Sequence, residues 1–372
     1  MFAKVEPQEE DVAKFQMIRN WAEERGIYKS IDGGKTWKKT LFVNNYAGAS
    51  ELSIDMNNPQ VLYAALWHHQ RTPWKMISGG EGSGLYKSVD AGETWNRLED
   101  GLPKELGKLA ISVCRSNSDK VYALVESDTQ TDQSGLYVSN NAGKSWNQVS
   151  DDNRLTQRAW YYIEVFTDPT DDETVYVLSA PALRSKDGGK NWERITGTHG
   201  DYHDLWINPK NPKNMVIAND GGAAISFNFA KSWSSQDIMP TAQFYRINTD
   251  NQFPYNIYGG QQDNSSVKIA SMNMTGYSIS ERNWTSAAGG ESAFLAFDKD
   301  NPKITVGGSY LGTIEALDME NKVSTNIMAA PIQYLGKTAR DMKYLYNWNA
   351  PIIWSQHEPN TIFHAAQLVL KS

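Results

Sequence analysis

The sequence has very little cysteine: Cys114 is the only one in 372 residues. An internal disulfide is therefore excluded, and the run LAISVC predicts a buried strand in which the thiol acts as a small apolar group. No run approaches 18 apolar residues, which excludes a membrane-spanning helix. Acidic residues outnumber basic ones, 43 to 36, and this balance argues against a nucleic-acid partner, which would require a basic surface.

The N-terminus lacks the apolar stretch of a secretory signal. MFAKVEPQEEDVAKFQMIRNWAEER is acidic, and its apolar residues Val12, Phe15, Ile18 and Trp21 recur at helical spacing. We predict a helical segment over residues 1–25 and one repeat domain over residues 26–372.

An octapeptide returns along the chain. SIDGGKTW begins at residue 30, and SVDAGETW, SNNAGKSW, SKDGGKNW and SFNFAKSW begin at 88, 139, 185 and 226. Each copy follows a short apolar run, such as GLYKS. A Pro/Asn/Asp-rich turn leading into another apolar run, as in MNNPQVLYAAL and PTDDETVYVLS, alternates with it.

These runs are rich in Val, Ile, Tyr and Trp, and turn residues separate them, which is typical of β-strands. One unit reads as strand A, an Asn/Pro turn, strand B, a loop, strand C, the octapeptide and strand D. Four strands in about every 40–60 residues predict an all-β fold, a β-propeller of four-stranded blades. A jelly roll or sandwich is the alternative, but neither would repeat one turn so faithfully.

Six units are complete or nearly so. Residues 26–40 supply only strands C and D, and residues 347–372 supply A, B and the start of C. Joined, these ends would form a seventh blade and close the ring, removing exposed sheet edges. Because both ends look incomplete, we interpret the chain as a piece of a longer repeat protein.

The octapeptide resembles the Asp-box, or bacterial neuraminidase repeat, of sialidases, xyloglucanase-type glycoside hydrolases and sortilin-like propellers. From about residue 24 onward, stretches such as EERGIYKSIDGGKTW and HDLWINPKNP are similar to bacterial proteins labelled as Asp-box glycosyl hydrolases or sortilin-type. The resemblance implies a propeller and a secreted, periplasmic or cell-surface location. A sialidase is disfavoured, because the Arg-Ile-Pro sequence that usually precedes its first box is missing.

The octapeptide itself is interpreted as architecture. Its aspartates can accept bonds from turn amides, its glycines allow positive φ, and its tryptophans are expected to pack between blades. Two copies replace the aspartate with asparagine, which a catalytic carboxylate would not tolerate. The residues of this structural set are Asp32, Trp37, Asp90, Trp95, Trp146, Asp187, Trp192 and Trp233.

Blade topology places the octapeptides and Asn/Pro turns on one face, so a functional site should lie among the B–C and D–A loops. Unusual residues fall in those loops. The candidate catalytic acids are Asp204, Asp220, Asp263 and Glu291, and the candidate ligand-binding residues are Arg71, Trp74, Arg158, Trp160, His199, Asp201, His203 and Gln262.

Strand alternation predicts His199, Asp201 and His203 on one face, with Asp204 on the other. No cofactor is expected. The alternative is a divalent metal on that face, since imidazole and carboxylate are suitable ligands. Paired carboxylates predict a glycosidase acid and base, which must stand roughly 6.5–9.5 Å apart in an inverting enzyme. Acids also terminate strands simply to solvate loops.

Three functions remain open. The first is a glycoside hydrolase acting through the loop-face acids. The second is a non-catalytic, sortilin-like propeller that binds a peptide, a protein or a glycan. The third is a structural module within a longer chain that carries further domains.

Overall fold

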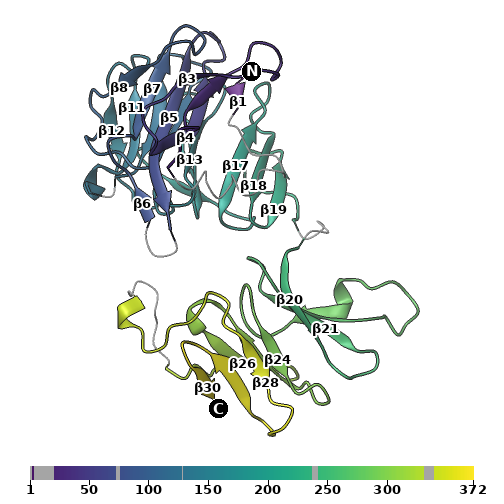
Figure 1. Cartoon of the computed structure of the whole chain (residues 1–372). Coiled ribbons are helices and arrows are strands. Elements are labelled where there is room, and N and C mark those ends of the chain that lie inside the picture. Colours follow the sequence, from purple (N-terminus) through teal and green to yellow (C-terminus); the bar gives the residue numbers. More distant parts are fainter. Residues whose placement is uncertain (1, 4–20, 73–75, 128, 237–241, 331–338) are drawn as a thin grey trace. The chain divides into compact units, whose positions relative to one another are not determined.

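The computed structural model describes residues 2–3, 21–72, 76–127, 129–236, 242–330 and 339–372. The chain forms two compact units, Met1–Ile238 and Met239–Ser372, called unit 1 and unit 2 (Figure 1). Most of the helix predicted for residues 1–25 lies outside the described residues; β1, Phe2–Ala3, is a strand. Within the described ranges, helix is limited to four short 3₁₀ turns: η2 Thr131–Gln133, η3 Glu281–Asn283, η4 Tyr310–Gly312 and η5 Ala339–Asp341.

Unit 1 consists of antiparallel sheets that follow one another along the chain (Figure 1). The first sheet contains β1, β2 (Ile27–Lys29) and β3 (Lys38–Leu41). The second contains β4 (Ala47–Ile54), β5 (Leu62–Arg71), β7 (Gly84–Ser88) and β8 (Asn96–Leu98), and β6 (Met76–Ser78) adds to β5. The third contains β9 (Leu109–Val113), β10 (Val121–Val125), β11 (Gly135–Ser139) and β12 (Asn147–Ser150). The fourth contains β13 (Glu164–Thr167), β14 (Val175–Leu178), β15 (Ala182–Ser185) and β16 (Glu193–Ile195), and the fifth β17 (Tyr202–Ile207), β18 (Met215–Asn219) and β19 (Gly222–Ser226).

Unit 2 repeats the same strand order in three sheets. They contain β20 (Phe244–Thr249), β21 (Asn256–Gln261), β22 (Ser266–Ala270) and β23 (Trp284–Ser286); β24 (Leu295–Phe297), β25 (Ile304–Gly308), β26 (Ile314–Asp318) and β27 (Val323–Asn326); and β28 (Ile352–Trp354), β29 (Ile362–Ala365) and β30 (Val369–Lys371).

From the second sheet of unit 1 onward, and throughout unit 2, the first strands of successive sheets within a unit lie beside one another. In unit 1, β4 contacts β9, β9 contacts β13 and β13 contacts β17; in unit 2, β20 contacts β24 and β24 contacts β28. Consecutive antiparallel meanders that meet along their first strands are the blades of a propeller. The all-β, blade-built fold predicted from the sequence is confirmed. The number of blades, the closure of the ring and a single domain over 26–372 stay predictions.

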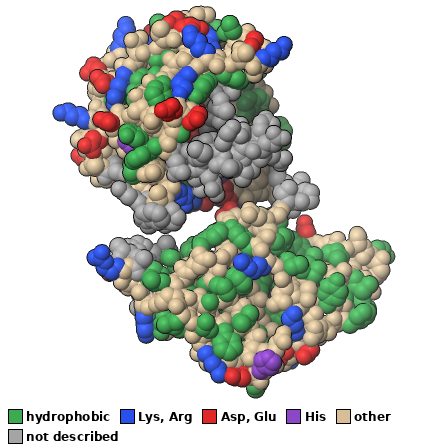
Figure 2. Space-filling model, in the orientation of Figure 1, with side chains coloured by type: hydrophobic (Ala, Val, Ile, Leu, Met, Phe, Trp, Pro, Cys, Tyr) green, Lys and Arg blue, Asp and Glu red, His purple; other side chains and the backbone are tan. Residues whose placement is uncertain are grey.

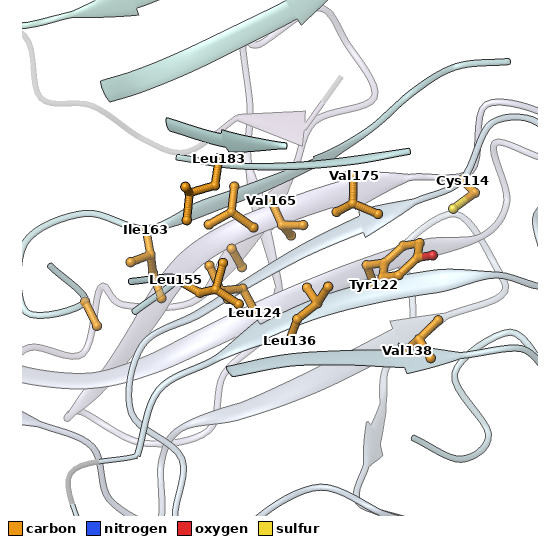
Figure 3. Packing of buried hydrophobic residues seen from close by; sticks show 13 residues of the cluster. Cys114, Tyr122, Leu124, Leu136, Val138, Leu155, Ile163, Val165, Val175 and Leu183 are labelled. Carbon is orange, nitrogen blue, oxygen red and sulfur yellow. The ribbon is translucent and has the colours of Figure 1, made fainter. Parts of the chain in front are cut away.

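The core lies between neighbouring sheets, face against face. Figure 3 shows Leu124 and Leu136 of the third sheet packing against Val165 and Leu183 of the fourth. Cys114 is buried in the same cluster, as its apolar context predicts. Each interface contains its own cluster, so stability arises from contacts between nearest-neighbour sheets.

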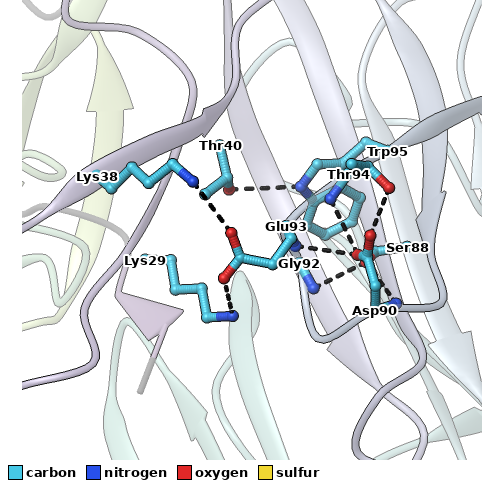
Figure 4. A network of polar contacts seen from close by, with 9 residues as sticks. All are labelled: Lys29, Lys38, Thr40, Ser88, Asp90, Gly92, Glu93, Thr94 and Trp95. Carbon is cyan, nitrogen blue, oxygen red and sulfur yellow. Dashed lines mark hydrogen bonds and ion pairs between the residues drawn. The ribbon is translucent and has the colours of Figure 1, made fainter.

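The octapeptides form five turns with the same bonding, which we call box turns. In the second, Ser88 Oγ accepts the Gly92 amide at 2.8 Å and donates to Asp90 Oδ1 at 2.7 Å, while the Thr94 amide donates to Asp90 Oδ1 at 2.9 Å (Figure 4). Asn141 of the third box turn accepts the Ser145 amide at 2.9 Å. An asparagine oxygen therefore replaces the aspartate without changing the turn.

The burial predicted for the box tryptophans is wrong for Trp37. Trp146 is only 3% exposed, whereas Trp37, in the first sheet of unit 1, is 36% exposed. The other box tryptophans pack against the preceding sheet. Trp95 shows this packing, since its Nε1 donates to Thr40 of the preceding sheet at 3.4 Å (Figure 4). Trp192 and Trp233 are partly buried in the same manner. Of the residues after the fifth box turn, the structure describes only 234–236 before 242, and these form no strand; the Ser234 amide donates to the Ile225 carbonyl at 2.9 Å.

On the face drawn in Figure 2, the Lys and Arg side chains of the described residues are scattered among acidic ones. No helix among the described residues is both long and apolar enough to span a bilayer.

Candidate functional site

A small hollow lies at the loop end of unit 1, opposite the box turns. It is lined by Arg158, Tyr161, Tyr162, Ser179, Asp201, Tyr202 and His203. These residues come from the D–A loop between β12 and β13, the end of β14 and the start of β17. The lining side chains leave no room for a water-sized molecule between them. Any ligand must therefore lie on the rim.

The D–A loop is held firmly by its own contacts. Leu155 and Ala159 are buried in the core between the third and fourth sheets. The amides of Tyr161 and Tyr162 donate to the Arg158 carbonyl at 2.8 and 2.6 Å, and the Arg158 amide donates to Ser179 Oγ at 3.3 Å. The side chains of this loop are thus presented by a fixed backbone.

Arg158 lies at the centre of the rim. Its guanidinium forms an ion pair with Asp201. It also lies 5.2 Å from the ring centroid of Trp160 and 5.1 Å from that of Tyr161, within range of a cation–π interaction. Trp160 and Tyr161 remain 41% and 45% exposed, so Arg158 fixes two aromatic rings that still present surface to solvent.

His203 and Asp220 form a second pair beside the first. His203 Nε2 lies 2.5 Å from Asp220 Oδ1. Tyr162 packs against the His203 ring with centroids 4.9 Å apart, and its hydroxyl donates to the His203 carbonyl. Burial raises the pKa of Tyr162, and the nearby carboxylates of Glu164, Asp204 and Glu51 raise it further. The hydroxyl therefore remains a neutral donor.

The prediction that His199, Asp201 and His203 share one face is wrong for His199, whereas Asp201 and His203 both line the hollow. Asp201 has a φ of +53°, and the pairing of β17 with β18 shifts register between Tyr202 and Asp204, so residues 199–203 are not regularly extended. His199 Nδ1 lies 3.0 Å from the carbonyl of Gly200 rather than facing the pair. Within the described part of the chain, no three His, Cys, Asp or Glu side chains gather as metal ligands.

The remaining unit 1 candidates lie apart from the hollow's lining. Asp204 is exposed on β17, and its Oδ1 accepts the Leu205 amide at 2.8 Å. Arg71 is exposed at the end of β5. Trp74 lies outside the described residues.

Three of the candidate residues, Gln262, Asp263 and Glu291, lie in unit 2. Gln262 Nε2 donates to Asp263 Oδ1 at 2.8 Å, and the Tyr245 hydroxyl donates to Gln262. Burial raises the pKa of Tyr245, with Glu291 and Asp263 adding to it. The four candidate acids are therefore split, with Asp204 and Asp220 in unit 1 and Asp263 and Glu291 in unit 2.

Several residues around the hollow have no recognisable sequence signal. Lys108, 7% exposed, has its Nζ 5.1 Å from the Tyr162 ring centroid and donates to the Tyr161 carbonyl at 3.4 Å. In the sequence, it simply precedes an apolar strand. Tyr162 has no distinctive signal either, because buried tyrosines are common between blades. Only the spatial contacts reveal either residue.

The chain is similar in sequence to one protein family and to two fungal enzymes. A family model described as Sortilin-Vps10 (sortilin, neurotensin receptor 3) matches residues 25–182. A protein of Neosartorya fischeri named probable oligoxyloglucan-reducing end-specific xyloglucanase is 24% identical over 237 residues, covering 55% of this chain and 28% of that protein. The oligoxyloglucan-reducing end-specific xyloglucanase of Emericella nidulans is 24% identical over 200 residues, covering 49% and 23%. The chain resembles sortilin-like and xyloglucanase-type propellers.

Solved structures with similar strand arrangements include a GH74 enzyme of Niastella koreensis and YCF48 bound to D1 peptide. The first has a TM-score of 0.36 at 12% identity, covering 92% of this chain and 66% of that one. The second has a TM-score of 0.37 at 12% identity, covering 88% and 93%. These scores are too low to carry an argument about function. The chain also spans only 28% and 23% of the length of the two xyloglucanases.

Proposed function

We propose that the chain is a carbohydrate-binding propeller whose ligand rests on Trp160 and Tyr161. The observation that carries this proposal is the pair of half-exposed rings held by Arg158, beside the carboxylate of Asp201, paired with Arg158, and that of Asp220, in contact with His203. A sugar ring has an apolar C–H face, which packs on aromatic rings, and a hydroxyl edge, which needs charged or polar partners. The rim of the hollow offers both within one fixed loop.

Binding fits the unit 1 geometry better than hydrolysis does. A glycosidase needs one carboxylic acid that gives a proton and one carboxylate that acts as base or nucleophile. In unit 1, Asp201 is occupied by Arg158 and Asp220 by His203, so both serve first to fix the rim.

Hydrolysis of an O-glycosyl bond is the second candidate, and the names of the relatives favour it. It would act through acids from the set Asp204, Asp220, Asp263 and Glu291. A loss of turnover on xyloglucan in Asp220→Asn or Glu291→Gln, with the melting temperature unchanged, would establish it. A wild-type chain that releases no reducing ends from xyloglucan would contradict this second candidate.

The test of binding is calorimetry with xyloglucan oligosaccharides and, separately, with a panel of sialosides and peptides. Trp160→Ala should lower the affinity for the oligosaccharide about tenfold, the loss of roughly one stacking contact. Trp206→Ala is the matched control, because Trp206 is 54% exposed in the same unit but lies in β17, outside the D–A loop that carries Arg158 and Trp160. Binding of peptides alone would replace the glycan with a peptide ligand.

The proposal also places the protein where such glycans occur, secreted, periplasmic or on the cell surface. A tagged chain found only in the cytoplasm of its native host would contradict this location.

A further inference from the structure

We propose that unit 2 associates with a second copy of this chain through exposed apolar side chains at one end of its first sheet. We call these six side chains the neutral patch: Phe253, Tyr255, Met272, Met274, Tyr277 and Ile279. The inference is independent of the proposed function, because the neutral patch lies in unit 2 and the rim of the hollow lies in unit 1.

The neutral patch is formed by two turns that lie side by side. Phe253 and Tyr255 lie in the turn between β20 and β21, and the other four members lie in the loop between β22 and η3. β21 pairs with β22 from Asn256 opposite Ala270, and the Ser271 amide donates to the Tyr255 carbonyl at 2.8 Å. Both turns therefore leave the sheet at the same end, and the longer one extends away from it (Figure 1).

The neutral patch is large enough for a protein interface. Phe253 is 86% exposed, Tyr277 80% and Met274 66%, and the other three members are 42–49% exposed. An aromatic side chain can bury roughly 150–250 Å², so the six together leave on the order of 700 Å² in contact with water. Soluble monomers rarely expose a connected apolar patch of more than a few hundred Å². A stable interface covers about 800 Å² on each partner, so the neutral patch supplies most of the area that a dimer needs.

The longer of the two turns is held by its own hydrogen bonds. Asn273 Oδ1 accepts the Thr275 amide at 3.0 Å and the Thr275 hydroxyl at 2.8 Å, and Asn273 Nδ2 donates to the Ser278 carbonyl at 3.2 Å. The Ser280 amide donates to Asn283 Oδ1 at 2.8 Å, where the loop enters η3. The apolar side chains are therefore presented by an ordered backbone, which reduces the entropy lost on association.

The neighbouring sheet of unit 2 shows that the fold does not require apolar side chains at these positions. It has Lys299 and Asp300 between β24 and β25, and Glu320 and Lys322 between β26 and β27. In the first sheet, by contrast, residues 251–256 and 271–280 contain no charged side chain. The apolar composition is therefore specific to this one sheet and calls for a partner surface.

The absence of charge favours a second copy as that partner. In a two-fold symmetric dimer the same patch meets itself, so a patch of one charge sign would repel its own copy. A neutral, apolar patch is complementary to itself, and its burial against a second neutral patch leaves no charge without a partner. A partner recognised through charge would find no counter-charge among the residues of the two turns.

The experiment measures the mass of the full chain by sedimentation equilibrium over a range of concentrations. The wild-type chain should form a dimer. Tyr277→Lys should raise the dissociation constant about a hundredfold, because the symmetry places the new charge in the interface twice. Tyr310→Lys is the matched control, because Tyr310 is 40% exposed in η4, at the opposite end of the unit 2 sheets, and should leave the dimer intact.

Phe253→Lys tests whether the two turns act together, and it should weaken the dimer as Tyr277→Lys does. Melting temperatures of the two variants should match that of the wild type, because both side chains lie almost fully in solvent. A wild-type chain that stays monomeric at every concentration would overturn the proposal, as would a dimer that neither variant weakens. Binding of the monomer to phosphatidylcholine vesicles, lost in Tyr277→Lys, would also overturn it and assign the neutral patch to a lipid surface.

Discussion

At one end of the unit 1 sheets, the box turns repeat the same few hydrogen bonds, whereas at the other end each loop has its own contacts. Ser88 and Asp90 bond within a stretch of eight residues. Arg158 bonds to Asp201 across two sheets. The hydrogen bonds of a box turn lie within one octapeptide, so the turn recurs in several blades and tolerates aspartate-to-asparagine replacement. The contacts at the loop end join residues from different blades.

The largest expected effect concerns the packing of the box tryptophans against the neighbouring sheet. Trp146 is 3% exposed and packs with Tyr63 and Leu98 of the preceding sheet. Trp146→Ala should lower the free energy of unfolding by about 3–5 kcal/mol, as for other buried large aromatics. Trp37→Ala, at an exposed site, should cost much less. Chemical denaturation measures both, and equal losses would show that burial does not separate the two box tryptophans.

At the loop end, the effect should appear in binding rather than in stability. Arg158→Met removes the ion pair with Asp201 and the cation over Trp160 and Tyr161. We expect about a tenfold loss of oligosaccharide affinity, because the rings lose their fixed orientation. The melting temperature should change little, since the core residue Leu155 still anchors the loop. Calorimetry measures the affinity and thermal unfolding the melting temperature, both on one preparation. Full affinity in Arg158→Met would contradict a role of Arg158 in binding.

Two substitutions of Asp90 distinguish the role of its negative charge from that of its acceptor oxygen in the box turn. Asp90→Asn should be nearly neutral, because Asn141 already accepts the equivalent amide. Asp90→Ala should lower the melting temperature, because the Thr94 amide loses its acceptor. An asparagine variant as unstable as the alanine variant would mean that the charge, rather than the acceptor oxygen, maintains the turn.

Lowering the pH should destabilise the box turns that contain aspartate but not those that contain asparagine. A side-chain bond from Thr36 lowers the pKa of Asp32 to about 2, and one from Asn191 does the same for Asp187. Because these values lie below those of the unfolded chain, the carboxylates stabilise their turns at higher pH and lose that contribution as pH falls from about 4 towards 2. Amide exchange at Thr36 should therefore accelerate relative to exchange at Ser145 of the third box. Parallel acceleration at both amides would contradict this assignment.

The smallest expected effect concerns the fifth box, where glycine is missing. Phe229 and Ala230 have φ values of 59° and 57°, in the left-handed region where glycine is favoured. Ala230→Gly should stabilise unit 1 by up to about 1 kcal/mol, since it relieves this strain. Ala224→Gly, in the regular strand β19, is the opposite control and should destabilise. A loss of stability in Ala230→Gly would show that the buried methyl group contributes more than the strain costs.

The sequence by itself determined the blade pattern and the bonding of the box turns. Alternating strands and turn residues act over a few positions, so the partners of Ser88 and Asp90 lie within the quoted octapeptide. Even the substitution of asparagine at 141 could be read as neutral, because both side chains present the same acceptor oxygen.

Tertiary structure alone decided the loop end. The register shift in β17 and the positive φ of Asp201 overturned the alternation predicted for residues 199–203, because strand periodicity holds only where pairing is regular. The partnership of Arg158 with Asp201, and the place of Lys108 behind Tyr161 and Tyr162, join segments far apart in the chain. Such contacts arise from how neighbouring sheets pack, and no pattern within a short stretch of sequence encodes them.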